Sequence, residues 1–223
     1  QLRGIKSAID SNFANGIHSQ ATGSGKSIMA LKIMWEFYKI NPTKSQMWLC
    51  ERKDIPQKLF FNTEKNGRKI IAKPKHKKWK WWKKHDIIDM YCFDVKEYIY
   101  DKNKKWTTEI NSNNNGKPKF IIINRAFMTS KSKEQGKKYR YQEIIGTNYP
   151  KLTIFDECHS GMSKTTYQLL NFIKYNWESK IQGLSATPYR KGKSPTEINI
   201  NLDIDDEEIK EELNTTDNEK KLI

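Results

Sequence analysis

A short run of small and polar residues, Ala21-Thr22-Gly23-Ser24-Gly25-Lys26-Ser27, constrains the fold of this chain more than any other feature. The residues before it predict a short buried strand over residues 16–19, and the apolar positions after it predict a helix over residues 27–38. Gly23 and Gly25 lack the Cβ atom that would keep backbone N–H groups away from a bound phosphate. Strand, glycine-rich loop and helix in this order predict an α/β fold built on a parallel sheet.

The same loop carries residues that suit a nucleoside triphosphate with Mg²⁺. Backbone N–H groups of residues 22–25, namely Thr22, Gly23, Ser24 and Gly25, are expected to surround the phosphates. Lys26 is expected to bring its charge to the β- and γ-phosphates, and Ser27 to offer a hydroxyl to Mg²⁺. Gln20 stands where the general pattern has Gly. A Gly/Ser-rich surface loop without a ligand is the alternative, which the flanking strand and helix disfavour.

A second segment, about 130 residues later, places two acids at the end of a predicted strand. The β-branched and aromatic residues 152–155 read as a central parallel strand, so Asp156 and Glu157 follow its carboxyl end. Asp156 is expected to hold Mg²⁺ and Glu157 to orient and polarise the attacking water. Taken alone, the two acids could equally be a helix N-cap and a solvated neighbour. The glycine-rich loop upstream favours the catalytic interpretation.

Three segments together resemble a known family. Residues 21–27 (Ala-Thr-Gly-Ser-Gly-Lys-Ser), 156–159 (Asp-Glu-Cys-His) and 185–188 (Ser-Ala-Thr-Pro) resemble motifs I, II and III of superfamily 2 helicases and translocases. The similar branch contains DEAH-like helicases, the motor subunits of type I and type III restriction enzymes, and helicases of large DNA viruses. The resemblance covers residues 1 to about 192 and implies a RecA-like P-loop NTPase fold, with helices on both faces of the sheet, and ATP hydrolysis.

Further roles follow only from this resemblance. It implies that His159 couples the γ-phosphate site to motif III, and that Ser185 and Thr187 relay the nucleotide state to a bound strand. It implies that Gln1 stands where an adenine-reading Gln would end its motif. It also implies a second RecA-like lobe in the full-length protein, whose arginine finger completes the ATP site. No matching arginine motif follows Pro188, so this chain is expected to be one lobe of a two-lobe motor.

The order of predicted elements extends the parallel sheet. Further strands are expected at residues 47–50, 87–93, 120–124, 152–155 and 180–184, and further helices at residues 55–62 and 164–175. We therefore expect a RecA-like ATP-binding domain over residues 1–192, with a basic insertion over about residues 64–118. Residues 193–223 are expected to form an acidic linker or tail.

The charge of the chain points to a polyanionic partner. The chain has 41 Lys and Arg against 26 Asp and Glu, a net charge of +15, and such an excess attracts nucleic acid. Residues 65–84 contain ten of these cations, no acid and three tryptophans. Lysines beside aromatic rings are typical of surfaces that bind nucleic-acid strands. The proposed contacts are Arg52, Lys77, Lys78, Trp81, Lys83 and Lys84. Equally, the tryptophans could anchor an insertion to the core while its lysines are only solvated.

Residues 203–219 reverse this balance, with nine acids and Lys210 as the only cation. Such a run is typical of a solvated helix or a disordered linker, and could also connect to the second lobe or mimic phosphate on the basic segment.

Cys50, Cys92 and Cys158 fit neither a disulfide framework nor a zinc site. The sequence has no signal peptide and no long apolar run. We expect a soluble intracellular protein without membrane contact, in the cytoplasm, the nucleus or a viral factory.

These observations favour an ATP-dependent motor on nucleic acid, with ATP and Mg²⁺ as cofactors and DNA favoured over RNA. An RNA helicase is one alternative. Another P-loop enzyme, such as a kinase, is disfavoured by the Asp-Glu-Cys-His and Ser-Ala-Thr-Pro segments. A non-hydrolysing nucleic-acid-binding module is disfavoured by the intact Lys26 and Glu157.

Overall fold

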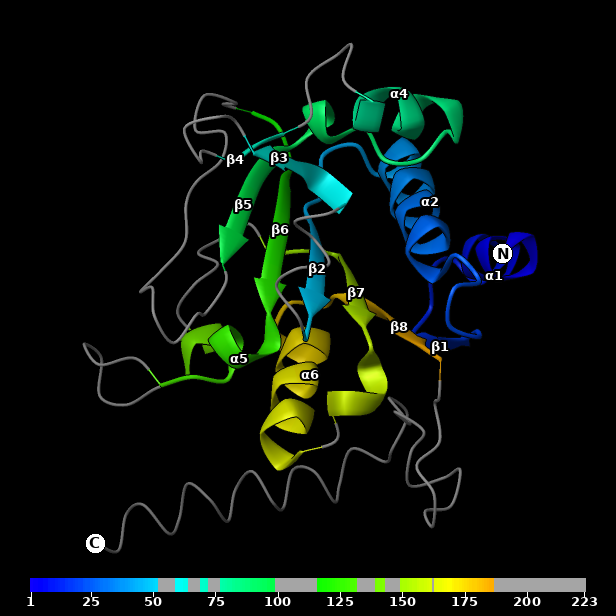
Figure 1. The fold of residues 1–223 in the computed structure, drawn as a ribbon. Coiled ribbons are helices and arrows are strands. Elements are labelled where there is room, and N and C mark those ends of the chain that lie inside the picture. The colour runs from blue at the N-terminus through cyan, green and yellow to red at the C-terminus, as the bar shows by residue number, and fades with distance from the viewer. Residues whose placement is uncertain are drawn as a thin grey trace, which may run out of the picture.

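The computed structural model describes residues 1–51, 59–63, 69–71, 77–98, 116–131, 139–142, 149–161 and 163–186. Its centre is a sheet of six strands, all paired in parallel. Across the sheet lie β1 (Gly16–Ser19), β8 (Lys180–Ser185), β7 (Leu152–Asp156), β2 (Gln46–Cys50), β6 (Lys119–Asn124) and β5 (Asp94–Tyr98) (Figure 1). The predicted parallel sheet is therefore confirmed.

Alternation along the strands divides the interior into two cores. Met47 and Leu49 of β2 belong to one core, whereas Trp48 and Cys50 belong to the other, and all four are fully buried. Successive side chains of a strand point to opposite faces, so a central strand buried on both sides is apolar throughout. Each large apolar side chain buried in this way contributes about 1.5–3 kcal/mol relative to exposure.

Helices cover both faces, as expected. On one face lie α2 (Lys26–Ile40) and α1 (Leu2–Asp10); on the other lie α6 (Lys164–Asn176) and the short α5 (Arg125–Met128) (Figure 1). Helix α1 sits close on α2 because Gly4 has no side chain: a Cβ atom there would come within 2.6 Å of the Met29 sulfur. Helix α6 begins at Ser163, whose hydroxyl accepts a hydrogen bond from the Thr166 N–H.

One predicted element is wrong, and another ends earlier than predicted. Residues 87–93 are not a strand, because Met90–Cys92 forms a 3₁₀-helix, η1, which the Asp89 side chain caps by accepting from the Tyr91 N–H. The strand at this place, β5, begins at Asp94 instead. Most of the helix predicted over residues 55–62 lies outside the described residues. In its described part, residues 59–60 are helical, whereas residues 61–62 belong to a strand, β3 (Phe61–Thr63), which pairs antiparallel with β4 (Lys69–Ile71).

Within the basic insertion the structure contains a helix that the sequence analysis does not predict, α4 (Lys77–Lys84). Its Trp82 is 1% exposed and belongs to the core under α1 and α2. Asp86 lies in the turn after α4. It pairs with Lys32 and Lys39 of α2 and accepts a hydrogen bond of 3.1 Å from the Trp35 indole N–H. Helix α4 therefore lies beside the C-terminal half of α2, at the end away from the glycine-rich loop (Figure 1).

The predicted acidic tail and the rest of the insertion lie outside the described residues. Two remaining short 3₁₀-helices are η2 (Arg140–Gln142) and η3 (Cys158–Gly161). No helix among the described residues is long and apolar enough to cross a membrane.

Candidate functional site

The three motif segments leave neighbouring strands at one edge of the sheet. The glycine-rich loop follows β1, Ser185 ends β8, and Asp156 ends β7, and these strands are adjacent in that order. Neighbouring strands are about 4.8 Å apart, so the loop and the carboxylates lie on either side of Ser185. Ligands of open α/β sheets bind at this carboxyl edge.

The loop backbone has the shape that a phosphate site requires. Gly23 and Gly25 have φ values of 78° and 86°, in the left-handed region that residues with a Cβ atom rarely adopt. Gly25 is the N-cap of α2, so the free N–H groups of the first helical turn open onto the loop. Residues 21–24 are exposed. A phosphate could therefore reach these N–H groups from solvent.

Gln20 organises the loop from within. Its backbone N–H donates to the Ser185 carbonyl at 3.0 Å, which fixes the start of the loop to the end of β8. Its carbonyl accepts a hydrogen bond of 3.3 Å from Lys26 Nζ, and its side chain contacts Ser24 Oγ and the Met29 sulfur. The sequence analysis treats Gln20 only as a departure from the general pattern. The structure shows it as the residue that joins the loop to motif III and holds the Lys26 ammonium over the loop.

Gln1 lies on the same loop. Its side-chain amide donates to the Ser24 carbonyl at 2.5 Å, and a Cβ atom on Gly25 would come within 2.1 Å of the same nitrogen. The N-terminal residue is thus close to the phosphate-binding segment. Its role in reading adenine stays a prediction.

Asp156 is a buried carboxylate with an unsatisfied oxygen. It is 3% exposed, and its Oδ2 has no hydrogen-bond partner among the described residues. Burial, and then the charge of Glu157, raise the pKa of Asp156 to about 6. An unpaired buried carboxylate is costly, and a cation at Oδ2 would remove that cost.

Glu157 is held in an unusual backbone conformation. Its φ is 54°, in the left-handed region, which costs a residue other than glycine about 1–3 kcal/mol and is often found at functional sites. Its carboxylate is one-third exposed and lies 3.3 Å from His159 Nδ1. The turn after β7 therefore presents the Glu157 carboxylate to solvent at the edge where Asp156 stays buried.

His159 connects motif II with motif III. The same Nδ1 atom lies 3.0 Å from Ser185 Oγ, and the Ser185 side chain is fully buried. The geometry therefore places His159 between Glu157 and the end of β8, where the resemblance implies a coupling role. That role stays a prediction, and Thr187 and Arg52 lie outside the described residues. Cys158, between the two acids and His159, is buried, and burial raises the pKa of its thiol to about 12.

A further polar cluster at this edge is missed by the sequence analysis. Arg125 donates from Nε and Nη2 to the two oxygens of Glu51, at 2.6 and 2.7 Å, and from Nη1 to Thr166 Oγ1 at 3.2 Å. Glu51 follows β2 and Arg125 follows β6, its neighbour. Each residue directly follows a strand, but the sequence does not show that these two strands are neighbours, so it carries no signal that predicts the pair.

The structure separates the proposed nucleic-acid contacts of α4 into two groups. Lys77, Lys83 and Lys84 are all exposed, and of these three Lys83 forms an ion pair. Lys78 donates to the Phe61 carbonyl, with a pKa lowered by burial, and Lys83 pairs with Asp89 at 3.0 Å. Trp81 is half-buried against the core, its ring 5.3 Å from that of His85.

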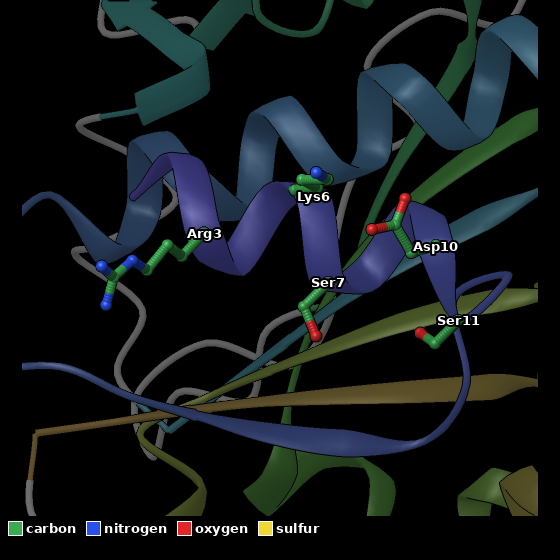
Figure 2. Close-up of a pocket in the computed structure, with 5 residues that line it drawn as sticks. All are labelled: Arg3, Lys6, Ser7, Asp10 and Ser11. Atoms are coloured by element: carbon green, nitrogen blue, oxygen red, sulfur yellow. The ribbon is translucent and has the colours of Figure 1, made fainter.

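A shallow hollow on the outward side of α1 contains none of the motif residues. It is lined by Arg3, Lys6, Ser7, Asp10 and Ser11 (Figure 2). The phosphate loop is exposed to solvent at residues 21–24. The geometry of the backbone and of the carboxylates, and not the presence of a hollow, identifies the site.

Comparison with known proteins places the chain in a family. The family model described as "Type III restriction enzyme, res subunit" matches residues 1–190. Among solved structures, the chain is similar to the Sulfolobus solfataricus SWI2/SNF2 ATPase core in complex with dsDNA, with 13% sequence identity and a TM-score of 0.48. The match covers 88% of this chain and 33% of that chain, so this chain spans about a third of that structure's length. No curated protein matches the chain.

Proposed function

We propose that this chain binds ATP with Mg²⁺ and drives movement on DNA. The premise is that the chain belongs to the family of the type III restriction enzyme res subunit and is a RecA-like ATPase lobe of superfamily 2. One observation carries this proposal most directly. The buried Asp156, with its unpartnered oxygen, lies one residue from the exposed Glu157, and His159 joins that turn to motif III. Such an arrangement suits a nucleotide site that signals to motif III whether ATP is bound.

The residues present fit ATP and Mg²⁺. The N–H groups of residues 22–25 and the first turn of α2 suit the phosphates, and Lys26 supplies a positive charge. Asp156 and the Ser27 hydroxyl would hold Mg²⁺, which usually takes one or two protein ligands together with substrate phosphates and water. No group of three or more His, Cys, Asp or Glu side chains that could hold a metal ion occurs in the described part of the chain. When bound, Mg²⁺ neutralises charge that develops on the phosphates.

Glu157 is the residue proposed to act on water. Its carboxylate is exposed enough to meet a water at the carboxyl edge, and the contact with His159 fixes its direction. A carboxylate in that position can accept a proton from water as it attacks the γ-phosphate. His159 and Ser185, with Thr187 beyond the described residues, are proposed to pass the resulting change to the nucleic-acid contacts.

DNA is proposed as the partner because of the net charge of +15 and because the family is that of a restriction enzyme. RNA is the alternative, and a direct comparison of the two ligands decides between them.

Contacts are proposed at Arg52 and at α4. Within α4, Lys77, Lys80 and Lys84 are exposed and follow the i, i+3, i+7 spacing of one helix face, so we add Lys80 to the proposed contacts Lys77, Lys78, Lys83 and Lys84. Trp81 on the same side remains a proposed stacking residue. The protein is proposed to work with a second RecA-like lobe.

Two substitutions test the nucleotide site. Lys26→Ala should remove most ATP binding, because a charge on the phosphates is lost. Glu157→Gln should keep binding but stop turnover, because the proton acceptor is lost while the loop is intact. Binding is measured with a fluorescent ATP analogue and turnover by phosphate release, both in the full-length protein.

Lys44→Ala and Glu178→Gln are matched controls, since both residues are exposed and lie away from the carboxyl edge. Neither control should change binding or turnover. Normal turnover in Glu157→Gln would contradict the role proposed for Glu157, and undiminished ATP binding in Lys26→Ala would contradict the proposed site.

A further inference from the structure

Arg125 joins three elements that are separate in the sequence. Glu51 is the first residue after β2, Arg125 begins α5 after β6, and Thr166 lies in the first turn of α6. The Arg125 guanidinium contacts both of the others: its fork meets the Glu51 carboxylate in two parallel hydrogen bonds, and its remaining nitrogen reaches Thr166. A two-bond pair between planar groups fixes their relative orientation as well as their distance.

The Thr166 end of this network is rigid. Thr166 is fully buried, and its hydroxyl also lies 2.9 Å from that of Ser163, the N-cap of α6. The Arg125 side chain is 22% exposed and that of Glu51 31%. An ion pair that is partly exposed adds little to stability. Orientation of the chain segments, more than stability, is therefore what the network provides.

Thr166 is close in sequence to the catalytic turn. Asp156 ends β7, Glu157 and His159 follow directly, and α6 begins at Lys164. A shift of the turn that carries Glu157 therefore reaches the first turn of α6 through a short connection. From Thr166, the Arg125 side chain leads to Glu51, and the chain continues from Glu51 into Arg52 and Lys53.

We propose that Arg125 is a positioning residue that transmits the state of the nucleotide site, through Thr166 and Glu51, to the chain that leaves β2. The inference rests on the proposed function for its ligand, ATP. It requires no particular nucleic acid. It gives the segment after β2, where Arg52 is a proposed DNA contact, a defined mechanical link to the residues that act on the γ-phosphate.

Amide hydrogen exchange of residues 1–223, measured by mass spectrometry with and without ATP and Mg²⁺, tests the link. In the unsubstituted chain, nucleotide should slow exchange in residues 20–27 and also in residues 51–60. Arg125→Gln should keep the first effect and lose the second. Glu51→Gln should do the same, and the double variant should be no worse than either single one, because the two residues act as one unit.

Lys151→Gln is the matched control. Lys151 pairs with Glu178 at 2.9 Å, and its side chain is about as exposed as that of Arg125. The pair lies at the amino ends of the strands, opposite the carboxyl edge. The substitution should leave the nucleotide effect on residues 51–60 unchanged. A purely structural role of Arg125 would speed exchange equally with and without ATP, whereas the link predicts loss of the ATP-dependent difference.

Full retention of that difference in folded Arg125→Gln and Glu51→Gln would overturn the inference. Absence of any ATP effect on residues 20–27 in the unsubstituted chain would instead overturn the proposed nucleotide site, and this inference with it. In the full-length protein, ATP should change the affinity for a DNA oligonucleotide, and typical couplings are about 5- to 150-fold. Arg125→Gln should bring that ratio toward one while the affinity for ATP stays the same.

Discussion

At the scale of single residues, Asp156 is a buried carboxylate whose ionised form is costly to the fold. Its carboxylate is buried, one oxygen has no partner among the described residues, and the neighbouring Glu157 adds a second negative charge. Lys26 offsets part of this, but less than burial adds. The unfavourable interactions are those that a bound cation would relieve, so stability and function conflict at this position.

Asp156→Asn should stabilise the chain at neutral pH and abolish its response to Mg²⁺. Because the pKa of Asp156 rises from 3.8 to about 6, the folded chain binds this proton more tightly than the unfolded chain does. The stability that this group contributes is therefore present below pH 3.8 and lost as the pH rises toward 6. At pH 7.5 the free energy of unfolding of Asp156→Asn should exceed that of the unsubstituted chain by up to about 3 kcal/mol.

Urea denaturation followed by circular dichroism at pH 7.5 and pH 4 measures this difference, which should disappear at the lower pH. Asp10→Asn is the control, because Asp10 is exposed on α1 and its substitution should change little at either pH. A less stable Asp156→Asn at pH 7.5 would show that the carboxylate has a favourable partner in solution.

At the scale of elements, α4 combines an anchoring side with an exposed basic side. Trp82 is buried in the core, while Lys80 and Lys84 are exposed. Lys80→Gln combined with Lys84→Gln should reduce the slope of log K against log salt for single-stranded DNA by about 0.7 per lost contact. ATP affinity should not change, because α4 lies at the end of α2 away from the loop (Figure 1). Fluorescence anisotropy over a salt series measures the slope.

Arg3→Gln combined with Lys6→Gln is the matched control for α4. It also removes two exposed charges from one helix, on the hollow side of α1 (Figure 2). An equal change of slope in both double variants would show that the effect comes from net charge. No change of slope in either would show that the lysines of α4 are only solvated and do not contact DNA. Trp82→Ala should instead destabilise the fold by about 3–5 kcal/mol, the usual cost of emptying such a site.

Elements could be predicted from the sequence where their pattern follows from burial on both faces. The runs around Trp48, Ile122 and Ile154 are mostly apolar because helices cover both sides of these central strands. Strand β5 is at the edge of the sheet and alternates, with Val95 buried between Asp94 and Lys96, so its pattern is weaker. The neighbouring Ile87 and Ile88 are buried without belonging to a strand, and this apolar pair misled the prediction.

The site could be predicted where a motif demands particular backbone geometry, as at Gly23, Gly25, Asp156 and Glu157. Its supporting contacts could not. The bonds of Gln20 to Ser185 and of Arg125 to Glu51 depend on which strands are neighbours in the sheet. That order, β1-β8-β7-β2-β6-β5, is set by tertiary packing and cannot be read from local sequence.

At the scale of the whole molecule, the proposed ATP site calls for an arginine that stabilises charge on the γ-phosphate. Three arginines lie in the described residues. Arg125 is bound by Glu51 and Thr166, the Arg140 guanidinium lies 5.2 Å from the centre of the Phe127 ring, and Arg3 is exposed on the outward side of α1. The resemblance to superfamily 2 motors implies that a second lobe supplies this arginine, and we propose the same for this chain.

The isolated chain should bind ATP with Mg²⁺ weakly and hydrolyse it slowly. Arginine fingers supplied from outside a nucleotide site are worth about 10³- to 10⁵-fold in rate, so residues 1–223 should fall below the full-length protein by a factor of this order. DNA should stimulate the isolated chain little, since charge stabilisation would still be missing.

Phosphate release with and without DNA measures both effects, and Lys26→Ala shows how much of the residual rate belongs to this site. Strong DNA-stimulated hydrolysis, proportional to protein concentration, would place the arginine within this chain. Hydrolysis that rises more steeply than concentration would mean that a second copy supplies it.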